Sequence, residues 1–143
     1  MPERECSNLV IKLKPWWLSW AWWARGATIT IYPCIYATQI PLSAVTLGHE
    51  LVHFAQQKAA PSRVLWFLKY IFFCSFRRQV ELEAFTSTIR YYVSRNQFTL
   101  VVKTWLIAEL SGWTYLKMMS SSEAKKWVEE IASRIRKEAD NGD

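Results

Sequence analysis

Residues 47–55 read Leu-Gly-His-Glu-Leu-Val-His-Phe-Ala, and they include both histidines of the 143-residue chain. His49 and His53 stand four positions apart, with Glu50 directly after the first of them. On an α-helix, side chains at positions i and i+4 lie one above the other on the same face, so the two imidazoles can bind one metal ion. The stretch therefore predicts a metal-binding helix in the centre of the fold.

The spacing matches the HExxH pattern of zinc-dependent peptidases, in which two histidines bind Zn²⁺ and the glutamate acts as general base. Catalytic zinc sites have three protein ligands and leave the fourth position to water. We therefore predict His49 and His53 as metal ligands and Glu50 as the catalytic residue. The alternative is a buried helix whose histidines only form hydrogen bonds. The remaining residues of the motif segment are largely apolar, as a central helix requires: Leu47, Leu51, Val52, Phe54 and Ala55.

The third metal ligand must come from another part of the chain. A metzincin would place a glycine three residues and a third histidine six residues after the second one. Those positions hold Gln56 and Ala59, which excludes that class. Because the chain has no other histidine and no CxxC pair, the third ligand is expected to be a carboxylate, as in His₂Glu zinc sites.

Two glutamates on a later predicted helix are the candidates for this carboxylate. Glu81 and Glu83 are two positions apart, so they point in different directions and only one can face the metal. We predict Glu81, with Glu83 as the fallback, because the small Ala84 on the face of Glu81 lets the two helices approach each other. The other carboxylate is expected to be exposed or paired with one of three arginines, Arg77, Arg78 or Arg90.

Cysteine usage and the amino-terminal residues predict a compartment. Cys6, Cys34 and Cys74 are odd in number and irregularly spaced, which argues against a disulfide framework and for a reducing environment. The first residues carry both signs of charge and are not followed by the apolar core of a signal peptide. We expect a cytoplasmic protein that is free, peripheral to a membrane or assembled into a larger particle.

Length and composition predict one domain over residues 1–143. Hydrophobic residues make up 51% of the chain, which suffices for a single core. The formal net charge is +6, but the basic residues are spread along the chain and mixed with acids, and no nucleic-acid-binding motif accompanies them. No nucleic-acid partner is therefore expected.

Patterning predicts a mostly helical α+β fold with three regions. Residues 8–40 contain two strands, 8–14 and 27–33, expected to form an antiparallel pair, and a loop at 34–40. The metal-site helices fill residues 43–95, as a metal helix at 43–59 and a glutamate-bearing helix at 79–95. Residues 64–76 between them are expected to form a buried connecting helix, with an interfacial segment at a membrane surface as the alternative. Residues 98–138 form two C-terminal helices, at about 98–110 and 121–138, the second starting near Ser122 and Glu123.

The segment at residues 16–23 begins with Trp16, ends with Trp23 and contains five tryptophans. Indole rings suit a protein core, an interface with another protein or a membrane surface. The segment is therefore expected either to pack on the sheet of its own domain or to bind a protein partner or a membrane surface.

The stretch from His49 to Phe85 resembles small bacterial and phage proteins with a glutamate-type zincin core. The resemblance rests on His-Glu-Leu-Val-His-Phe-Ala-Gln-Gln, an aromatic linker with Phe67 and Tyr70, and Glu81-Leu-Glu-Ala, about a quarter of the chain. It implies a short twisted sheet whose edge strand lines a cleft, next to a metal helix and a glutamate helix. Better-known relatives often have Asp four residues after the ligand glutamate, to support a zinc-bound histidine. Phe85 takes that place here, so a backbone oxygen, Glu83 or a distant acid is expected to support the histidine instead.

These patterns predict a zinc-dependent metallopeptidase-like protein that acts on a peptide or protein substrate. Zn²⁺ would be held by the two histidines and Glu81, Glu50 would accept the proton of the attacking water, and the strand at 27–33 would align the substrate. Candidate donors to the oxyanion are Arg90, Tyr91 and Tyr92, and Gln56 is either a support for the site or a surface amide. The alternative is a structural or assembly protein, for example one associated with a phage, that keeps the scaffold and binds metal for stability.

Overall fold

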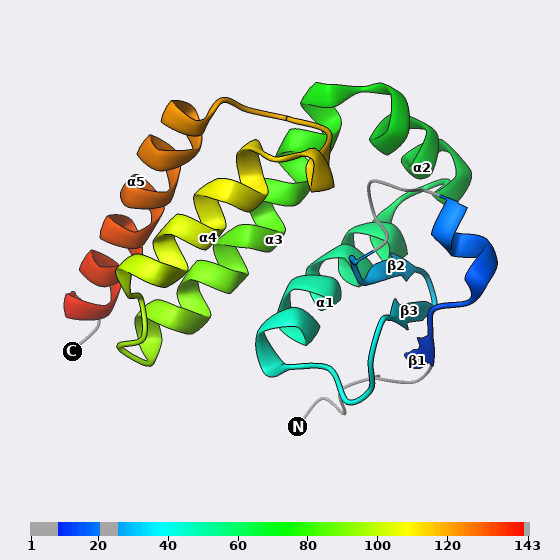
Figure 1. Ribbon diagram of the computed structural model, residues 1–143, viewed down its shortest axis with the longest axis horizontal. Coiled ribbons are helices and arrows are strands. Elements are labelled where there is room, and N and C mark those ends of the chain that lie inside the picture. The colour runs from blue at the N-terminus through cyan, green and yellow to red at the C-terminus, as the bar shows by residue number, and fades with distance from the viewer. Residues whose placement is uncertain (1–8, 21–25, 142–143) are drawn as a thin grey trace.

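The computed structural model of the protein describes residues 9–20 and 26–141. Figure 1 shows a small sheet and two helices on one side of the central helix α3, and two further helices on its other side. The strands are β1 (Val10–Leu13), β2 (Ile29–Ile31) and β3 (Cys34–Ala37), and a short 3-10 helix, η1 (Trp16–Trp20), follows β1. The α-helices are α1 (Ala44–Ala59), α2 (Arg63–Phe72), α3 (Cys74–Ser94), α4 (Leu100–Ser111) and α5 (Ser121–Asp140), with a second 3-10 helix, η3 (Trp113–Tyr115), after α4. The α+β class is therefore confirmed.

The sheet is mixed and has the order β1-β3-β2. The predicted antiparallel pair of residues 8–14 and 27–33 is wrong, because β3 lies between the two strands, parallel to β1 and antiparallel to β2. The segment predicted as a loop at 34–40 thus supplies the central strand. Its burial explains this position, since Ile35 and Ala37 are fully buried on one face of the strand.

Helix α1 carries the HExxH motif and begins where the sequence predicts. The side chain of Ser43 accepts a hydrogen bond from the backbone N–H of Thr46, which caps the helix. His49, Glu50 and His53 are all buried. The helix packs between β2 and α3, so that its motif faces the inside of the molecule from both sides.

The connecting helix is shorter and far more exposed than predicted. Helix α2 ends at Phe72, and α3 starts at Cys74, five residues earlier than the expected start at residue 79. Only Trp66 of α2 is buried, whereas Val64 and Phe72 are 71% and 74% exposed. The prediction of a buried connecting helix at 64–76 is therefore wrong, because α2 packs on the protein along one side only.

The main hydrophobic core lies among α3, α4 and α5. Helix α5 starts at Ser121, as the predicted range 121–138 has it, and it begins with a capping box in which Ser120 and Glu123 bind each other's backbone N–H groups. The buried side chains of this core come from all three helices: Phe85, Ile89, Leu106, Leu110, Ala124, Val128, Ile131, Ala132 and Ile135, with Met118 and Met119 from the preceding loop.

The tryptophan segment is only partly described. Trp16 is 86% exposed and Trp17 is 50% exposed, while the adjacent Leu18 is buried. The Trp17 ring lies edge-on to the ring of Tyr36 in β3, with centroids 6.5 Å apart. Residues 21–25, and with them Trp22 and Trp23, lie outside the described residues. Within the described part of the chain, no helix combines the length and the apolar character needed to cross a bilayer.

Candidate metal centre

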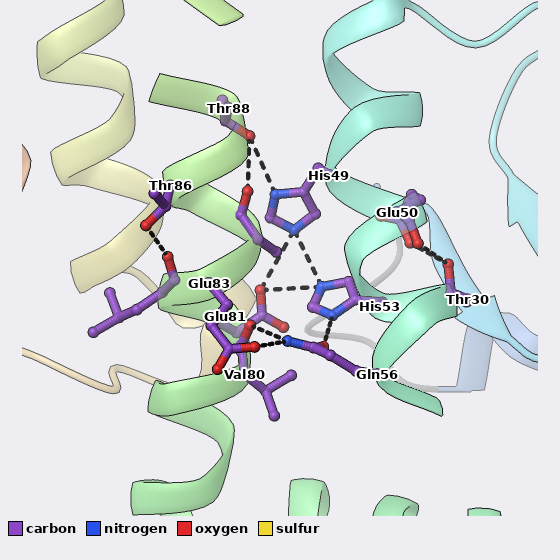
Figure 2. Close-up of polar contacts among 12 residues, drawn as sticks. Thr30, His49, Glu50, His53, Gln56, Val80, Glu81, Glu83, Thr86 and Thr88 are labelled. Carbon is purple, nitrogen blue, oxygen red and sulfur yellow. Dashed lines mark hydrogen bonds and ion pairs between the residues drawn. The ribbon is translucent and has the colours of Figure 1, made fainter. Parts of the chain in front are cut away.

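Three side chains from two helices converge in the interior, as Figure 2 shows. The Nε2 atoms of His49 and His53, both on α1, are 3.2 Å apart. Oε2 of Glu81, on α3, lies 3.5 Å from each of them. All three residues are buried, and among the described residues no other group of His, Cys, Asp or Glu side chains meets in this way. The structure thus brings together the three predicted ligands.

Small residues let α1 and α3 approach each other at this site. Ala84, one turn after Glu81, is fully buried, as the sequence argument requires. Gly48 faces α3, where a Cβ atom at its position would lie 3.7 Å from Oγ of Ser87. The close crossing of the helices places ligands from two helices within reach of one ion.

The arrangement fits a metal ion. Oε2 of Glu81 is buried and has no hydrogen-bond partner among the described residues, although it faces two imidazole nitrogens. A buried carboxylate oxygen without a partner is costly, and a bound cation would satisfy it. Two imidazole nitrogens and one carboxylate oxygen are a donor set that first-row transition metals accept.

The second nitrogen of each imidazole is also engaged. Nδ1 of His53 lies 3.0 Å from Oε1 of Gln56, and Nδ1 of His49 lies 3.3 Å from Oγ1 of Thr88. Such partners fix the ring orientation and leave Nε2 free to bind a metal. The expectation of a backbone oxygen or an acid in this role is wrong, because an amide and a hydroxyl serve instead. Phe85, which takes the place of Asp, packs edge-on against the His49 ring with centroids 4.7 Å apart.

Glu83, the fallback ligand, is exposed and points away from the two histidines. Its Oε2 accepts a hydrogen bond of 2.6 Å from Nε2 of Gln56, which also donates to the backbone oxygen of Val80. Glu83 thus holds the amide that supports His53. None of the three arginines expected to pair with it does so: Arg77 donates to backbone oxygens of α2, Arg78 pairs with Glu123, and Arg90 pairs with Glu138.

The other oxygen of Glu81 binds a residue of α2. The hydroxyl of Tyr70 donates a hydrogen bond to Oε1, which leaves Oε2 facing the histidines. Burial first, and then the adjacent Glu81 carboxylate, raise the pKa of Tyr70 well above its ordinary value, so the phenol keeps its proton. No pattern in the sequence predicts this contact, because it depends on how α2 folds back on α3.

The charges of the candidate ligands shift each other's pKa values. Burial disfavours the charged form of His53, but the carboxylates of Glu81 and Glu50 outweigh it and raise its pKa to about 9. Burial likewise opposes ionisation of Glu81, but the two imidazoles outweigh it and lower the pKa of Glu81 to about 2. His53 and Glu81 thus favour each other's charged form, and the carboxylate charge of Glu81 is what a metal cation would meet.

Glu50 follows His49 on α1, and its carboxylate is directed toward Thr30 of the sheet (Figure 2), while it borders the same cavity as the three ligands. Its Oε2 accepts a hydrogen bond of 2.6 Å from the hydroxyl of Thr30 on β2. Burial raises the pKa of Glu50 above its ordinary value, although the nearby histidines and the Thr30 hydroxyl act in the other direction. A carboxylate with a raised pKa is a stronger base, as proton transfer near neutral pH requires.

Two cavities meet at His49 and Glu50. The cavity on the α4 side has a volume of about 330 Å³ and reaches Trp105 and Glu109. The cavity on the α2 side has a volume of about 250 Å³ and is lined by all three candidate ligands and by apolar side chains such as Trp66. Residues 27–28, which lead into the edge strand β2, border both cavities. Both cavities thus open beside His49 and Glu50 of the candidate metal centre.

The candidate oxyanion donors named from the sequence lie elsewhere. Arg90 is bound to Glu138 of α5, and Tyr91 stacks under Arg95. Tyr115, in η3, borders both cavities beside Glu50 instead, and burial raises its pKa well above its ordinary value. Sequence reasoning missed Tyr115 because η3 lies far along the chain and carries no motif.

The described residues therefore contain a buried His49–His53–Glu81 cluster that is able to hold a metal ion, next to a cleft that Glu50 borders. Compared with family models, curated proteins and solved structures, the chain matches none of them, so its chemistry must be argued from its own residues.

Proposed function

We propose that the site binds Zn²⁺ and that the protein is a zincin-like, zinc-dependent peptidase. The observation that carries this proposal is the triangle formed by the two Nε2 atoms and Oε2 of Glu81, with sides of 3.2, 3.5 and 3.5 Å. Tetrahedral zinc with bonds of about 2.0–2.1 Å to nitrogen and oxygen separates its ligands by about 3.3 Å. The triangle is thus of the size that zinc requires.

The surroundings favour a catalytic over a purely structural metal. Structural zinc sites are closed by four protein ligands, whereas catalytic sites have three and an open position. Three candidate ligands meet among the described residues, and the cleft on the α2 side borders all of them. A site that opens into a cleft can admit a substrate and water.

Glu50 is the residue that would move the proton. Zinc, when bound, would act as a Lewis acid and lower the pKa of a water molecule in the site. Glu50 would take the proton from the attacking water and pass it to the leaving amine, with Thr30 holding its carboxylate in place. The protonated hydroxyl of Tyr115 is the donor available to the developing oxyanion.

The outer edge of β2 would align the substrate backbone. The Gln57 amide already occupies two groups of this edge: its Nε2 donates to the Thr30 oxygen at 2.8 Å, and its Oε1 accepts from the Tyr32 N–H at 2.9 Å. Residues 27–28, the segment before β2, border both cavities. The oxygen of Ala27 accepts a hydrogen bond of 3.1 Å from Nζ of Lys14, so the backbone of Thr28 would pair with a peptide. An extended peptide bound there would cross the site beside Glu50.

The first test is the variant Glu50→Gln. Loss of the general base should lower the rate of peptide cleavage by about a hundredfold or more, while bound zinc stays at one ion per chain. Cleavage is measured by mass spectrometry on zinc-loaded protein incubated with casein and with a synthetic peptide library, and zinc by elemental analysis. Glu130→Gln, the same change at an exposed position of α5, serves as the control and should leave both unchanged.

Two results would overturn the peptidase proposal. One is a zinc-loaded wild-type protein that cleaves no peptide in either substrate set, and the other is a Glu50→Gln variant as active as wild type. Stoichiometric zinc without any cleavage would favour the alternative, a structural or assembly protein in which the metal joins α1 to α3.

A further inference from the structure

The outward side of α2 is apolar. The helix turns Trp66 and Tyr70 toward the protein, where their rings stack with centroids 5.4 Å apart. On the opposite side, apolar residues recur at helical spacing and are 45–74% exposed: Val64, Leu65, Leu68, Ile71 and Phe72. A helix on the surface of a water-soluble domain normally presents polar residues on this side. The outer side of α2 thus exposes apolar side chains where a surface helix normally has polar ones.

The exposed tryptophans of η1 lie at the same end of the molecule. Figure 1 shows η1 beside α2 at the edge away from α4 and α5. Leu18 of η1 and Ile71 of α2 line the same cavity, which joins the two elements. We call the outer residues of α2 together with Trp16 and Trp17 the apolar face. Large exposed apolar patches of this kind mark binding surfaces.

Charge is distributed unequally between the two parts of the chain. From residue 6 to residue 80 there are eight Lys and Arg residues and a single acid, Glu50, which is buried. Residues 81–143 contain nine basic and nine acidic residues. The mixing of charges noted for the whole chain therefore holds only for its second part, and the part that carries the apolar face is strongly cationic.

Two cations flank the apolar side of α2. The guanidinium of Arg63 lies 4.2 Å from the centre of the Tyr32 ring, and the ammonium of Lys69 lies 5.9 Å from the centre of the Phe76 ring. Long basic side chains at the border of an apolar surface can keep their charges at the level of lipid headgroups. The combination of an apolar stripe, exposed indoles and flanking cations is that of an interfacial helix.

We propose that the apolar face binds the surface of an anionic phospholipid bilayer, with α2 lying in the plane of the headgroups. A second copy of the chain is a poorer occupant, because pairing of two such faces would bring two cationic regions together. With only ten residues, α2 is too short to span a bilayer, so it binds at the surface. This proposal is independent of zinc binding and of peptide hydrolysis.

The test is flotation of the full chain with lipid vesicles. Vesicles of phosphatidylcholine containing roughly one third phosphatidylglycerol should carry the protein upward, and vesicles of phosphatidylcholine alone should carry much less of it. The variant with Leu68→Ser and Phe72→Ser should reduce partitioning to the anionic vesicles by about tenfold or more. Because both residues are exposed, circular dichroism should show that the variant folds.

The matched control changes two apolar residues that are at least as exposed and lie in the part of the chain whose positive and negative charges balance. Leu100 and Val101 at the start of α4 are 76% and 78% exposed, and their change to Ser should leave flotation unchanged. Three results would overturn the proposal: no flotation with anionic vesicles, equal flotation of the α2 variant, or equal loss in the α4 control. A concentration-dependent dimer that the α2 variant abolishes, without any flotation, would assign the face to a second copy instead.

Discussion

Glu81 and Glu83 differ as candidate metal ligands because their side chains leave α3 in different directions. Glu81 faces α1 and leaves Oε2 without a hydrogen bond beside two imidazoles, whereas Glu83 binds the Gln56 amide at the surface. Both are carboxylates on the same turn of α3, so exchanging each for its amide makes the same chemical change. Only the change at Glu81 removes a ligand.

Glu81→Gln should therefore lower zinc content well below one ion per chain, while Glu83→Gln retains it. A neutral amide is a much poorer zinc ligand than a carboxylate. Removal of a partner that orients a ligand weakens metal affinity by about 10–100-fold, so Glu83→Gln should show at most this smaller loss. Elemental analysis after dialysis, followed by titration with a zinc-binding dye, measures both. Equal zinc content in the two variants would contradict the assignment of Glu81.

The ligands could be predicted from the sequence, but of the residues that support them only Gln56 could be named. His49, Glu50 and His53 follow from a local motif, and Glu81 follows from helical periodicity and the small Ala84. Thr88 and Tyr70 reach the site only because α2 and α3 cross α1 at particular angles. No spacing within the chain encodes such a crossing, so these contacts required the structure.

At the scale of elements, one glutamine joins the metal helix to the sheet. Gln57 is 1% exposed, and its amide binds the backbone of β2 at both Thr30 and Tyr32. It thereby fixes the position of β2 along α1, and with it the distance between Thr30 and Glu50. The Gln57 side chain thus makes the two backbone hydrogen bonds that a neighbouring strand would otherwise make at this edge of the sheet.

Gln57→Ala should lower the free energy of unfolding by about 2 kcal/mol, because it leaves the partly buried N–H of Tyr32 and the buried C=O of Thr30 without this partner. Gln79→Ala, on the exposed side of α3, makes the same change in another helix and should have little effect. Urea denaturation followed by circular dichroism measures the difference. Equal midpoints for the two variants would show that Gln57 does not hold the strand.

The bounds of helices and strands could be predicted where capping or helix-breaking residues set them. They could not be predicted where contacts between distant parts of the chain set them. Ser43 and Pro61 delimit α1 correctly, since capping and helix breaking are local effects. The strand β3 was predicted as a loop because only four residues form it, and its pairing depends on strands before it on both sides. The apolar sequence of α2 predicted burial, but amino-acid composition alone cannot distinguish a buried helix from an exposed binding surface.

At the scale of the whole molecule, the candidate metal centre joins two parts of the fold. Its ligands come from α1, which packs on the sheet, and from α3, which belongs to the three-helix core (Figure 1). An ion bound to both helices stabilises the folded state by mass action, because the unfolded chain does not preserve the site.

Removal of zinc with a chelator should therefore lower the melting temperature by about 10 °C. This corresponds to about 4 kcal/mol when free zinc exceeds its dissociation constant roughly a thousandfold. Differential scanning calorimetry with and without chelator measures the shift, and Glu81→Gln should already melt at the lower temperature and respond little. A metal-free protein that melts like the zinc-loaded one would contradict a role for the ion in joining the two parts.

Tyr70 connects the apolar face to the candidate metal centre. It belongs to α2, whose outer side forms the apolar face, while its hydroxyl binds the ligand Glu81. If contact with a bilayer displaces α2, the change in metal affinity and the change in lipid affinity must be equal by thermodynamic reciprocity. Zinc titration with and without vesicles, compared between wild type and Tyr70→Phe, would measure this coupling. Under the two proposals, one phenol would thereby make the binding of a metal ion depend on contact with a membrane.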